Sequence, residues 1–408
     1  MAEESGKGVL QFTNKEQLLP QEEMLETVTS HKKLTIGIPK EILFDESRVS
    51  IVPEGVRLLI ENGHRVFVEE NAGVKANFSN QEYADAGATI TDTATEVYKS
   101  DIIVKIAPPT LSELDLFSRN QTLFSAVQLT QQSKKYFEKL FQKRIMAIAY
   151  EFIKDKTGAL PVVRSMSEIV GNTSIVIAAE YLSNLEYGKG IILGGFPGIK
   201  PTEVVIIGAG TVSEYASRAA LGMGATVKIF DNSIYKLRAI QKNVGTRIFT
   251  SILQPSELES ALINANVVIA AKYSSDGKTP CFISEEIVKR MKPGSIIIDV
   301  SIDQGGCFET SKPTTHTNPV FKKYGITHYC VPNIASKVPH TASWSLNNFL
   351  TPLLLNIADM GGVANYLKRD APFSKGVYVF NGTLTKKQIG DRFDLRYRDL
   401  ELLLAAFR

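Results

Sequence analysis

The chain has 408 residues and a formal net charge of only +3, with 46 Lys and Arg side chains set against 43 Asp and Glu side chains. This balance argues against a nucleic-acid-binding surface, and three cysteines without a CxxC pair argue against a disulfide framework and a metal site. The apolar run 349–358 contains Pro352 and Asn356 and is too short to cross a membrane. Residues 1–33 are polar and do not form a signal peptide, so we expect a cytoplasmic protein with two domains.

The first part of the chain alternates between strands and helices at short intervals. Residues 1–33 are expected to form an N-terminal extension that is partly helical around Gln21–Thr27. The strands predicted after it are 34–39, 65–69, 89–90, 101–106, 122–129 and 145–151, and the helices between them are 53–62, 81–86, 93–99, 111–117 and 133–142. This alternation is typical of a mainly parallel sheet covered by helices on both faces.

A second sheet is expected further along the chain. Residues 162–187 form a helix rich in small side chains, and the Gly- and Pro-rich segment 188–201 forms a loop. Six strands follow, predicted at 204–208, 226–231, 246–250, 266–271, 295–300 and 326–331, and a helix at 344–358 is expected to pack back onto the first domain. The predicted fold class is α/β, with two Rossmann-like doubly wound domains and a cleft between them. The first domain comprises 34–161 plus 340–408, and the second comprises 162–339.

The segment 204–231 carries the clearest chemical signal, because it reads VVIIGAGTVSEYASRAALGMGATVKIFD. Gly208 and Gly210 permit a tight turn after an apolar strand, and the helix that begins near Thr211 and Val212 offers free backbone N–H groups to a pyrophosphate. Asp231 ends the next strand, where a carboxylate accepts hydrogen bonds from an adenosine ribose and favours NAD over NADP. The alternative is an ordinary glycine turn in an α/β domain. We interpret the second domain as an NAD-binding domain.

Ligands of such sheets lie beyond the carboxyl ends of the strands, so the residues that follow strands are candidates for the site. They are 105–109, Gln128, Asp231, 271–275, 303–306 and Asn333. Two α/β domains with a cleft between them suit an enzyme that brings a nicotinamide against a small substrate.

Five segments together resemble one known family. They are GIPKEILFDESRVSIVPEGVRLLIENGH (37–64), MSEIVGN (166–172), GGFPGIKPTEVVIIGAGTV (194–212), MKPGSIIIDVSIDQGGCFETSKPTTH (291–316) and YCVPNIASKVPHTAS (329–343). The chain is similar to the alanine dehydrogenases and, more distantly, to the NAD domain of the proton-translocating transhydrogenases. The resemblance covers about residues 34–376, and the IDQGGCFE and YCVPN runs are specific to the alanine dehydrogenase branch.

The resemblance implies roles for four residues. Arg48 would grip the substrate carboxylate, for which a guanidinium fork is well suited. Asp303 would assist the water and ammonia steps, and Ser167 and Asn333 would contact the nicotinamide end of the cofactor. The structural alternatives are a surface arginine near a turn, and ordinary capping or turn residues.

Two departures from the family pattern concern proton transfer. The family has a catalytic lysine in a KVKEP run, where this chain has Lys105 followed by Ala107, and a catalytic histidine in an FLHL-like run, where it has Gln128. In the family these two side chains hold and protonate the substrate carbonyl oxygen. Glutamine donates a hydrogen bond but does not exchange a proton near neutral pH. The loop 272–277 also lacks the apolar Pro-Gly ending that the family usually has.

Lys105 has two possible roles. It is two residues from Ala107, so in an extended strand both side chains point to the same face, and Lys105 then reaches toward the substrate. The other possibility, which we favour, is that Lys105 has a separate role and the position of the catalytic lysine is empty. With both possibilities kept open, the candidate catalytic residues are Asp303, Lys105 and Gln128.

We therefore expect an NAD-dependent dehydrogenase that converts L-alanine, NAD and water to pyruvate, ammonia and NADH, with weak or lost activity. One alternative is an NAD-binding paralogue with impaired catalysis and a regulatory role. Another is a related opine or other amino-acid oxidoreductase. The expected partners are a small-molecule substrate and further copies of the chain, a hexamer by resemblance, with no nucleic acid and no membrane.

Overall fold

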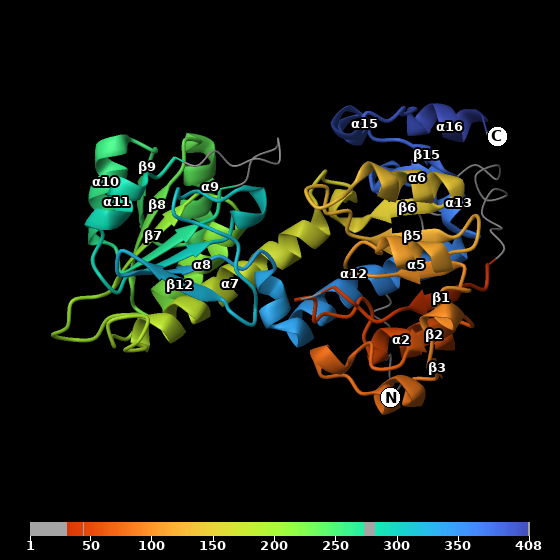
Figure 1. The fold of residues 1–408 in the computed structure, drawn as a ribbon, viewed down its shortest axis with the longest axis horizontal. Helices are drawn as coiled ribbons and strands as arrows, with labels where there is room; N and C mark the ends of the chain where they lie inside the picture. The colour runs from red at the N-terminus through yellow and green to blue at the C-terminus, as the bar shows by residue number, and fades with distance from the viewer. Residues whose placement is uncertain (1–30, 44, 273–281, 407–408) are drawn as a thin grey trace, which may run out of the picture.

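The computed structural model describes residues 31–43, 45–272 and 282–406, so the helix predicted around 21–27 lies outside the described residues. Two sheets organise the chain, one in each of two lobes that lie side by side in Figure 1. Strands and helices alternate along both lobes, and most strand pairs are parallel. The prediction of two doubly wound α/β units is confirmed.

The sheet of the first lobe has the strand order β15-β14-β6-β5-β4-β1-β2-β3. Its strands are β1 (Thr35–Ile38), β2 (Arg65–Glu69), β3 (Thr89–Thr91), β4 (Ile102–Val104), β5 (Thr122–Ser125), β6 (Met146–Ala149), β14 (Val377–Phe380) and β15 (Thr383–Leu384). The helices between the first six strands are α2 (Pro53–Glu61), α3 (Asn80–Asp85), α4 (Ala94–Val97), α5 (Leu111–Leu116) and α6 (Lys134–Gln142). Strands β1 to β6 pair in parallel, as the alternation predicts.

The sequence analysis missed the two C-terminal strands of this sheet. β14 pairs antiparallel with β6, and β15 pairs antiparallel with β14 at the sheet edge. The run VYVF of β14 is short and fully buried, and such a run lacks the alternation that identifies a half-exposed strand. The position of β14 in the sheet follows from its pairing with β6 and not from its own sequence.

The sheet of the second lobe has the order β12-β13-β11-β10-β7-β8-β9. Its strands are β7 (Glu203–Ile207), β8 (Thr226–Phe230), β9 (Phe249–Ser251), β10 (Val267–Ala270), β11 (Ile296–Asp299), β12 (Val320–Lys323) and β13 (Ile326–Tyr329), and its helices are α8 (Thr211–Gly222), α9 (Ile234–Val244), α10 (Pro255–Asn264) and α11 (Glu285–Arg290). The six predicted strands are present and parallel. The edge strand β12 was not predicted, and it pairs antiparallel with β13.

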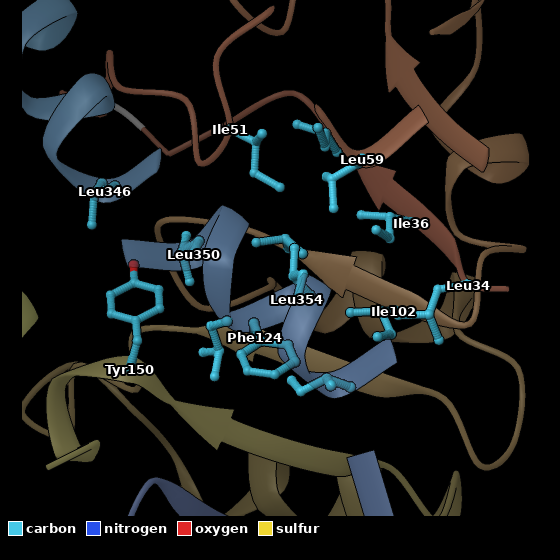
Figure 2. Close-up of a cluster of buried hydrophobic side chains, with 14 of the residues drawn as sticks. Leu34, Ile36, Ile51, Leu59, Ile102, Phe124, Tyr150, Leu346, Leu350 and Leu354 are labelled. Carbon is cyan, nitrogen blue, oxygen red and sulfur yellow. The ribbon is translucent and has the colours of Figure 1, made fainter. Parts of the chain in front are cut away.

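Two long helices, α7 (Pro161–Ser183) and α12 (Pro339–Asp359), run between the lobes in Figure 1. α7 packs closely against α8, because a Cβ on Gly171 would lie 2.5 Å from the backbone oxygen of Val212. α12 returns to the first lobe, where Leu346, Leu350 and Leu354 enter the core beside strands β1, β4 and β5 (Figure 2). Of the helices in the described residues, these two included, none is both long and apolar enough to cross a bilayer.

Candidate active site

The glycine turn of the second lobe lies between β7 and α8. Gly208 has a φ of +102°, and a Cβ on it would lie 2.4 Å from the backbone oxygen of Ala271, so only glycine fits there. Gly210 is the N-cap of α8, and no side chain among the described residues caps this helix. The backbone N–H groups of Thr211 and Val212 belong to the first turn, where donors lack intrahelical partners and the helix dipole favours an anion.

Asp231 follows β8 and lies next to this turn. Its Oδ2 accepts a hydrogen bond from the Ala209 N–H at 3.0 Å, and its Oδ1 accepts one from the Ser233 N–H at 2.7 Å. The residue is only 7% exposed. A pocket of about 370 Å³ opens beside it, lined by Ala209, Gly210, Asp231, Asn232, Ser233, Lys236, Ala271 and Lys272. The structure therefore brings the predicted glycine turn and the predicted acid to one pocket.

Asp299 at the end of β11 organises the loop that carries Asp303. One carboxylate oxygen accepts a hydrogen bond from the Ser301 N–H at 3.2 Å. The other accepts from the Cys307 N–H at 2.8 Å and from the Ser311 hydroxyl at 2.7 Å. The sequence analysis did not single out Asp299, although a carboxylate that ends an apolar strand is a usable signal. These bonds fix the backbone turn from which Asp303 projects.

Asp303 itself lies in the short helix η4 (Ile302–Gln304). The residue is exposed on one side, yet loss of hydration against the surrounding protein raises the pKa of its carboxyl to about 6. A carboxyl with this pKa exchanges a proton under mildly acidic to neutral conditions. That property is compatible with the role the resemblance gives to Asp303.

Arg48, in the segment after β1, is held by Glu46. Its Nε donates to Oε1 of Glu46 at 2.8 Å, and its Nη2 donates to Oε2 at 2.7 Å. The Nη1 group points at the sulfur of Met166, a weak acceptor 3.5 Å away on α7. Although burial opposes ionisation, the guanidinium lowers the pKa of Glu46 below its usual value. The edge of the Arg48 guanidinium formed by Nε and Nη2 is thus already bound to the carboxylate of Glu46.

Glu46 also contacts the second lobe. Its Oε2 accepts a hydrogen bond from Nδ2 of Asn333 at 2.9 Å, and its Oε1 lies 3.4 Å from the hydroxyl of Ser336. That hydroxyl in turn accepts a bond from the Ser47 N–H at 2.8 Å. Two of the predicted site residues, Arg48 and Asn333, therefore meet on one carboxylate that the sequence analysis missed.

A second contact between the lobes runs through His316. Its backbone N–H donates to Oδ2 of Asp45 at 3.2 Å, and its Nε2 lies 2.8 Å from the backbone oxygen of Asn333. Ser167 lies on α7 next to Met166 and is half-buried. Ser167, Arg48 and Asn333 thus come from segments that converge where the two lobes touch.

Lys105 lies between two carboxylates. Its Nζ donates to Glu113 at 2.5 Å and is 3.5 Å from Oε2 of Glu41, and the side chain is 1% exposed. Burial opposes the charge, but the two carboxylates outweigh it and raise the pKa of Lys105 above its ordinary value. Glu113 also accepts a hydrogen bond from the Tyr98 hydroxyl at 2.9 Å. This arrangement supports the interpretation that Lys105 has a separate, structural role.

Ala107 and Gln128, the two departures from the family pattern, follow β4 and β5. Ala107 is buried, and Gln128 is half-buried with a φ of +44°. The carboxyl of Glu151 lies beside the segment that carries Gln128, because its Oε1 accepts a bond from the Val127 N–H at 2.7 Å. Its Oε2 is buried with no hydrogen-bond partner among the described residues, and burial raises the pKa of Glu151 to about 7.

The loop that departs from the family pattern is described only in part. Residues 273–277 lie outside the described residues, whereas Lys272 lines the pocket beside Asp231. The altered loop therefore begins at the edge of the predicted dinucleotide site.

Comparison with known proteins assigns the family. The models "Alanine dehydrogenase/PNT, N-terminal domain" and "Alanine dehydrogenase/PNT, C-terminal domain" match residues 37–170 and 174–387. An alanine dehydrogenase of Methanococcus maripaludis is 38% identical over 373 residues, which cover 91% of this chain and 100% of that protein. One of Staphylococcus epidermidis is 37% identical over 369 residues, which cover 90% of this chain and 99% of that protein.

The solved structures agree with this result. An L-alanine dehydrogenase structure matches 88% of this chain and 99% of its own, with a TM-score of 0.83 and 36% identity. A transhydrogenase from Sinorhizobium meliloti matches 86% of this chain and 99% of its own, with a TM-score of 0.73 and 20% identity, which shows a shared fold. The chain belongs to the alanine dehydrogenase/PNT family.

Proposed function

We propose that this protein is an NAD-dependent amino-acid dehydrogenase of the alanine dehydrogenase type with weakened catalysis. The reaction is pyruvate + NH4+ + NADH + H+ ⇌ L-alanine + NAD+ + H2O. The observation that carries the proposal is a contrast within one chain: the pocket at the glycine turn and Asp231 is formed, whereas Ala107 and Gln128 occupy the two proton-handling positions. The proposal retains the cytoplasmic location predicted from the sequence.

The pocket beside Asp231 fits one end of a dinucleotide. The Gly208 turn lets the backbone approach closely, and the uncapped N-terminus of α8 supplies donors for a pyrophosphate. The Asp231 carboxylate accepts from ribose hydroxyls and repels a 2′-phosphate, which favours NAD. When bound, the nicotinamide supplies or accepts the hydride of the reaction.

Arg48, Gln128 and Asp303 bind the substrate and transfer protons in this proposal. Arg48 binds the substrate carboxylate, with Nη1 facing away from Glu46. Gln128 donates a hydrogen bond to the carbonyl oxygen, which orients the substrate without transferring a proton. Asp303, with a pKa of about 6, takes up and returns a proton during the water and ammonia steps.

A second candidate function is favoured by one observation. Lys105, the remaining lysine of the KVKEP-like run, is bound to Glu113 and Glu41, so its ammonium is engaged away from a substrate. A chain that binds NAD(H) without turnover would serve as a regulatory subunit. NADH binding without amination of any 2-oxo acid is the result that would favour this function.

We further propose that the protein assembles into a homo-oligomer, a hexamer by resemblance. Large apolar side chains are exposed on the C-terminal part of α7 and on the segment 184–202 after it, where Leu185 is 86% and Ile199 is 66% exposed. Val176, Ile192 and Phe196 extend this exposed apolar set. Exposed apolar side chains gathered on one segment of the chain are candidates for subunit contacts. Light scattering at micromolar concentration tests the assembly, and a monomer contradicts it.

The experiment for the catalytic proposal combines two assays on the same preparation. NADH binding is followed by fluorescence or calorimetry, and NADH oxidation is followed with pyruvate and ammonium. Binding together with slow turnover supports the proposal. Failure to bind NADH would contradict it.

A further inference from the structure

Glu46 occupies a position that joins the two lobes at the proposed site. Its side chain is 3% exposed and makes a bidentate contact with Arg48, which also donates its own backbone N–H to Oε1 at 3.1 Å. Nζ of Lys75 donates to the backbone oxygen of Glu46 at 3.2 Å. Arg48 thus holds the carboxylate of Glu46 on the first lobe, and Lys75 holds its backbone oxygen.

The same carboxylate reaches Asn333 on the second lobe. Oε2 accepts from Nη2 of Arg48 at 2.7 Å and from Nδ2 of Asn333 at 2.9 Å, so two donors from different lobes share one oxygen. Ser336 and Ser47 add the contacts at 3.4 and 2.8 Å that brace this junction. Hydrogen bonds to a buried, charged acceptor are strong and geometrically demanding.

We infer that Glu46 is a positioning residue that couples cofactor binding at Asn333 to substrate binding at Arg48. The inference rests on the proposed function, in which Arg48 binds the substrate carboxylate, and on the contact with the nicotinamide end that the family resemblance implies for Asn333. A cofactor that holds Asn333 in place also holds Oε2, and Oε2 fixes the plane of the Arg48 guanidinium. Coupling between binding sites is reciprocal, so substrate strengthens cofactor binding by the same factor.

Glu46→Gln removes the negative charge of this link with little change of shape, so the link is weakened. In either orientation of the amide, its N–H group faces a donor of Arg48, so the bidentate contact is lost. Glu54→Gln is the matched control, because Glu54 is an exposed glutamate of α2 whose nearest ion-pair contact, with Arg57, is 4.0 Å long.

The test is a double-mutant cycle with Arg48→Lys and Asn333→Ala, read as the NADH dissociation constant. Arg48→Lys keeps a positive charge beside Glu46, so the carboxylate is not left alone in a buried place. With Glu46 present, the effect of the double variant should differ from the product of the single effects by about threefold or more. With Glu46→Gln in all four proteins that factor should fall toward one, whereas Glu54→Gln should leave it unchanged.

A second measurement tests whether Glu46 couples NADH binding to pyruvate binding. In the unaltered protein, saturating NADH should lower the dissociation constant of pyruvate by about threefold or more, and Glu46→Gln should abolish this gain. A residue that merely supports the fold would lower stability without changing the ratio of the two pyruvate constants. An unchanged ratio in Glu46→Gln, or additive effects in the cycle with Glu46 present, overturns the inference.

The same cycle read as the free energy of unfolding in denaturant needs no ligand. If the unaltered protein fails to bind NADH, the proposed function is wrong, and the unfolding cycle then decides the link alone. Non-additive unfolding effects that disappear with Glu46→Gln support the junction between Arg48 and Asn333. Additive unfolding effects contradict it.

Discussion

The ammonium of Lys105 lies 2.5 Å from the carboxylate of Glu113, and both side chains are buried. Glu41 faces the same ammonium at 3.5 Å, and burial, together with the neighbouring carboxylates, raises the pKa of Glu41 to about 7 even though Lys105 opposes the rise. Lys105 is therefore the counter-ion of two acids in the core of the first lobe. This relationship supports a structural role for Lys105, and the family resemblance assigns the position of the catalytic lysine to Ala107.

Lys105→Met should destabilise the fold strongly. It leaves two buried carboxylates without their cation, and breaking a buried ion pair typically costs about 3–5 kcal/mol. Urea unfolding near neutral pH measures the loss. The control is Lys289→Met, which removes a half-exposed pair with Glu286 at 2.6 Å and should cost less than about 1 kcal/mol. Equal losses in the two variants would contradict the structural role of Lys105.

Asp231 should determine the preference for NAD(H) over NADP(H). Asp231→Asn keeps an acceptor for a backbone N–H but removes the charge, so NADP(H) should gain relative to NAD(H). Asp231→Ala also loses both bonds from Ala209 and Ser233, so NAD(H) binding should weaken by roughly ten- to hundredfold. Dissociation constants for both cofactors check this. Equal affinities in the unaltered protein would exclude the assigned role of Asp231.

Glu151→Gln should change the pH dependence of stability in a defined direction. Burial raises the pKa of Glu151 from 4.5 to about 7, so the folded state binds more protons than the unfolded state between these values. The unfolding free energy contributed by this group therefore falls as pH rises from 4.5 to 7 and stays low above pH 7. The variant lacks this loss, so its stability relative to the unaltered protein should rise over the same interval by up to about 3 kcal/mol.

Denaturant unfolding at a series of pH values measures the difference. Glu96→Gln is the control, since Glu96 is an exposed glutamate of α4. A flat curve for Glu151→Gln would show that the carboxyl beside Val127 is solvated in the folded protein.

Restoring the family pattern should raise activity. Ala107→Lys alone or Gln128→His alone should do little, because the two side chains act on the same substrate oxygen and their effects are not additive. The double variant should raise pyruvate amination by roughly 10²–10⁴-fold if a missing general acid limits the rate. The positive φ of Gln128 suits histidine, which tolerates this region better than most residues. Arg48→Ala in that background should abolish the gain.

The sequence predicted the features that depend on local pattern. The strands β7, β10 and β11 appear as apolar runs, and the turn at Gly208 is marked by its glycine. The edge strands β12 and β15, and β14 beside β15, depend on which partner strand accepts them, and a short segment does not encode that partner.

The long-range partners of the buried charged residues could not be predicted from the sequence either. Thr110 and Glu113 form a capping box at the start of α5, and their spacing alone predicts it. That the same Glu113 binds Lys105, and that Glu46 binds Asn333 across the lobes, follows only from the folded arrangement. Glu151 was missed for the same reason, whereas Asp299 ends an apolar strand and could have been found from the sequence.

The most direct test of the account is steady-state NADH oxidation with pyruvate and ammonium, measured beside NADH binding on the same sample. We expect saturable NADH binding with turnover roughly 10²–10⁴-fold below the enzyme median of about 10 s⁻¹. Turnover of about 10 s⁻¹ would contradict the proposal that Ala107 and Gln128 replace a lysine and a histidine needed for proton transfer.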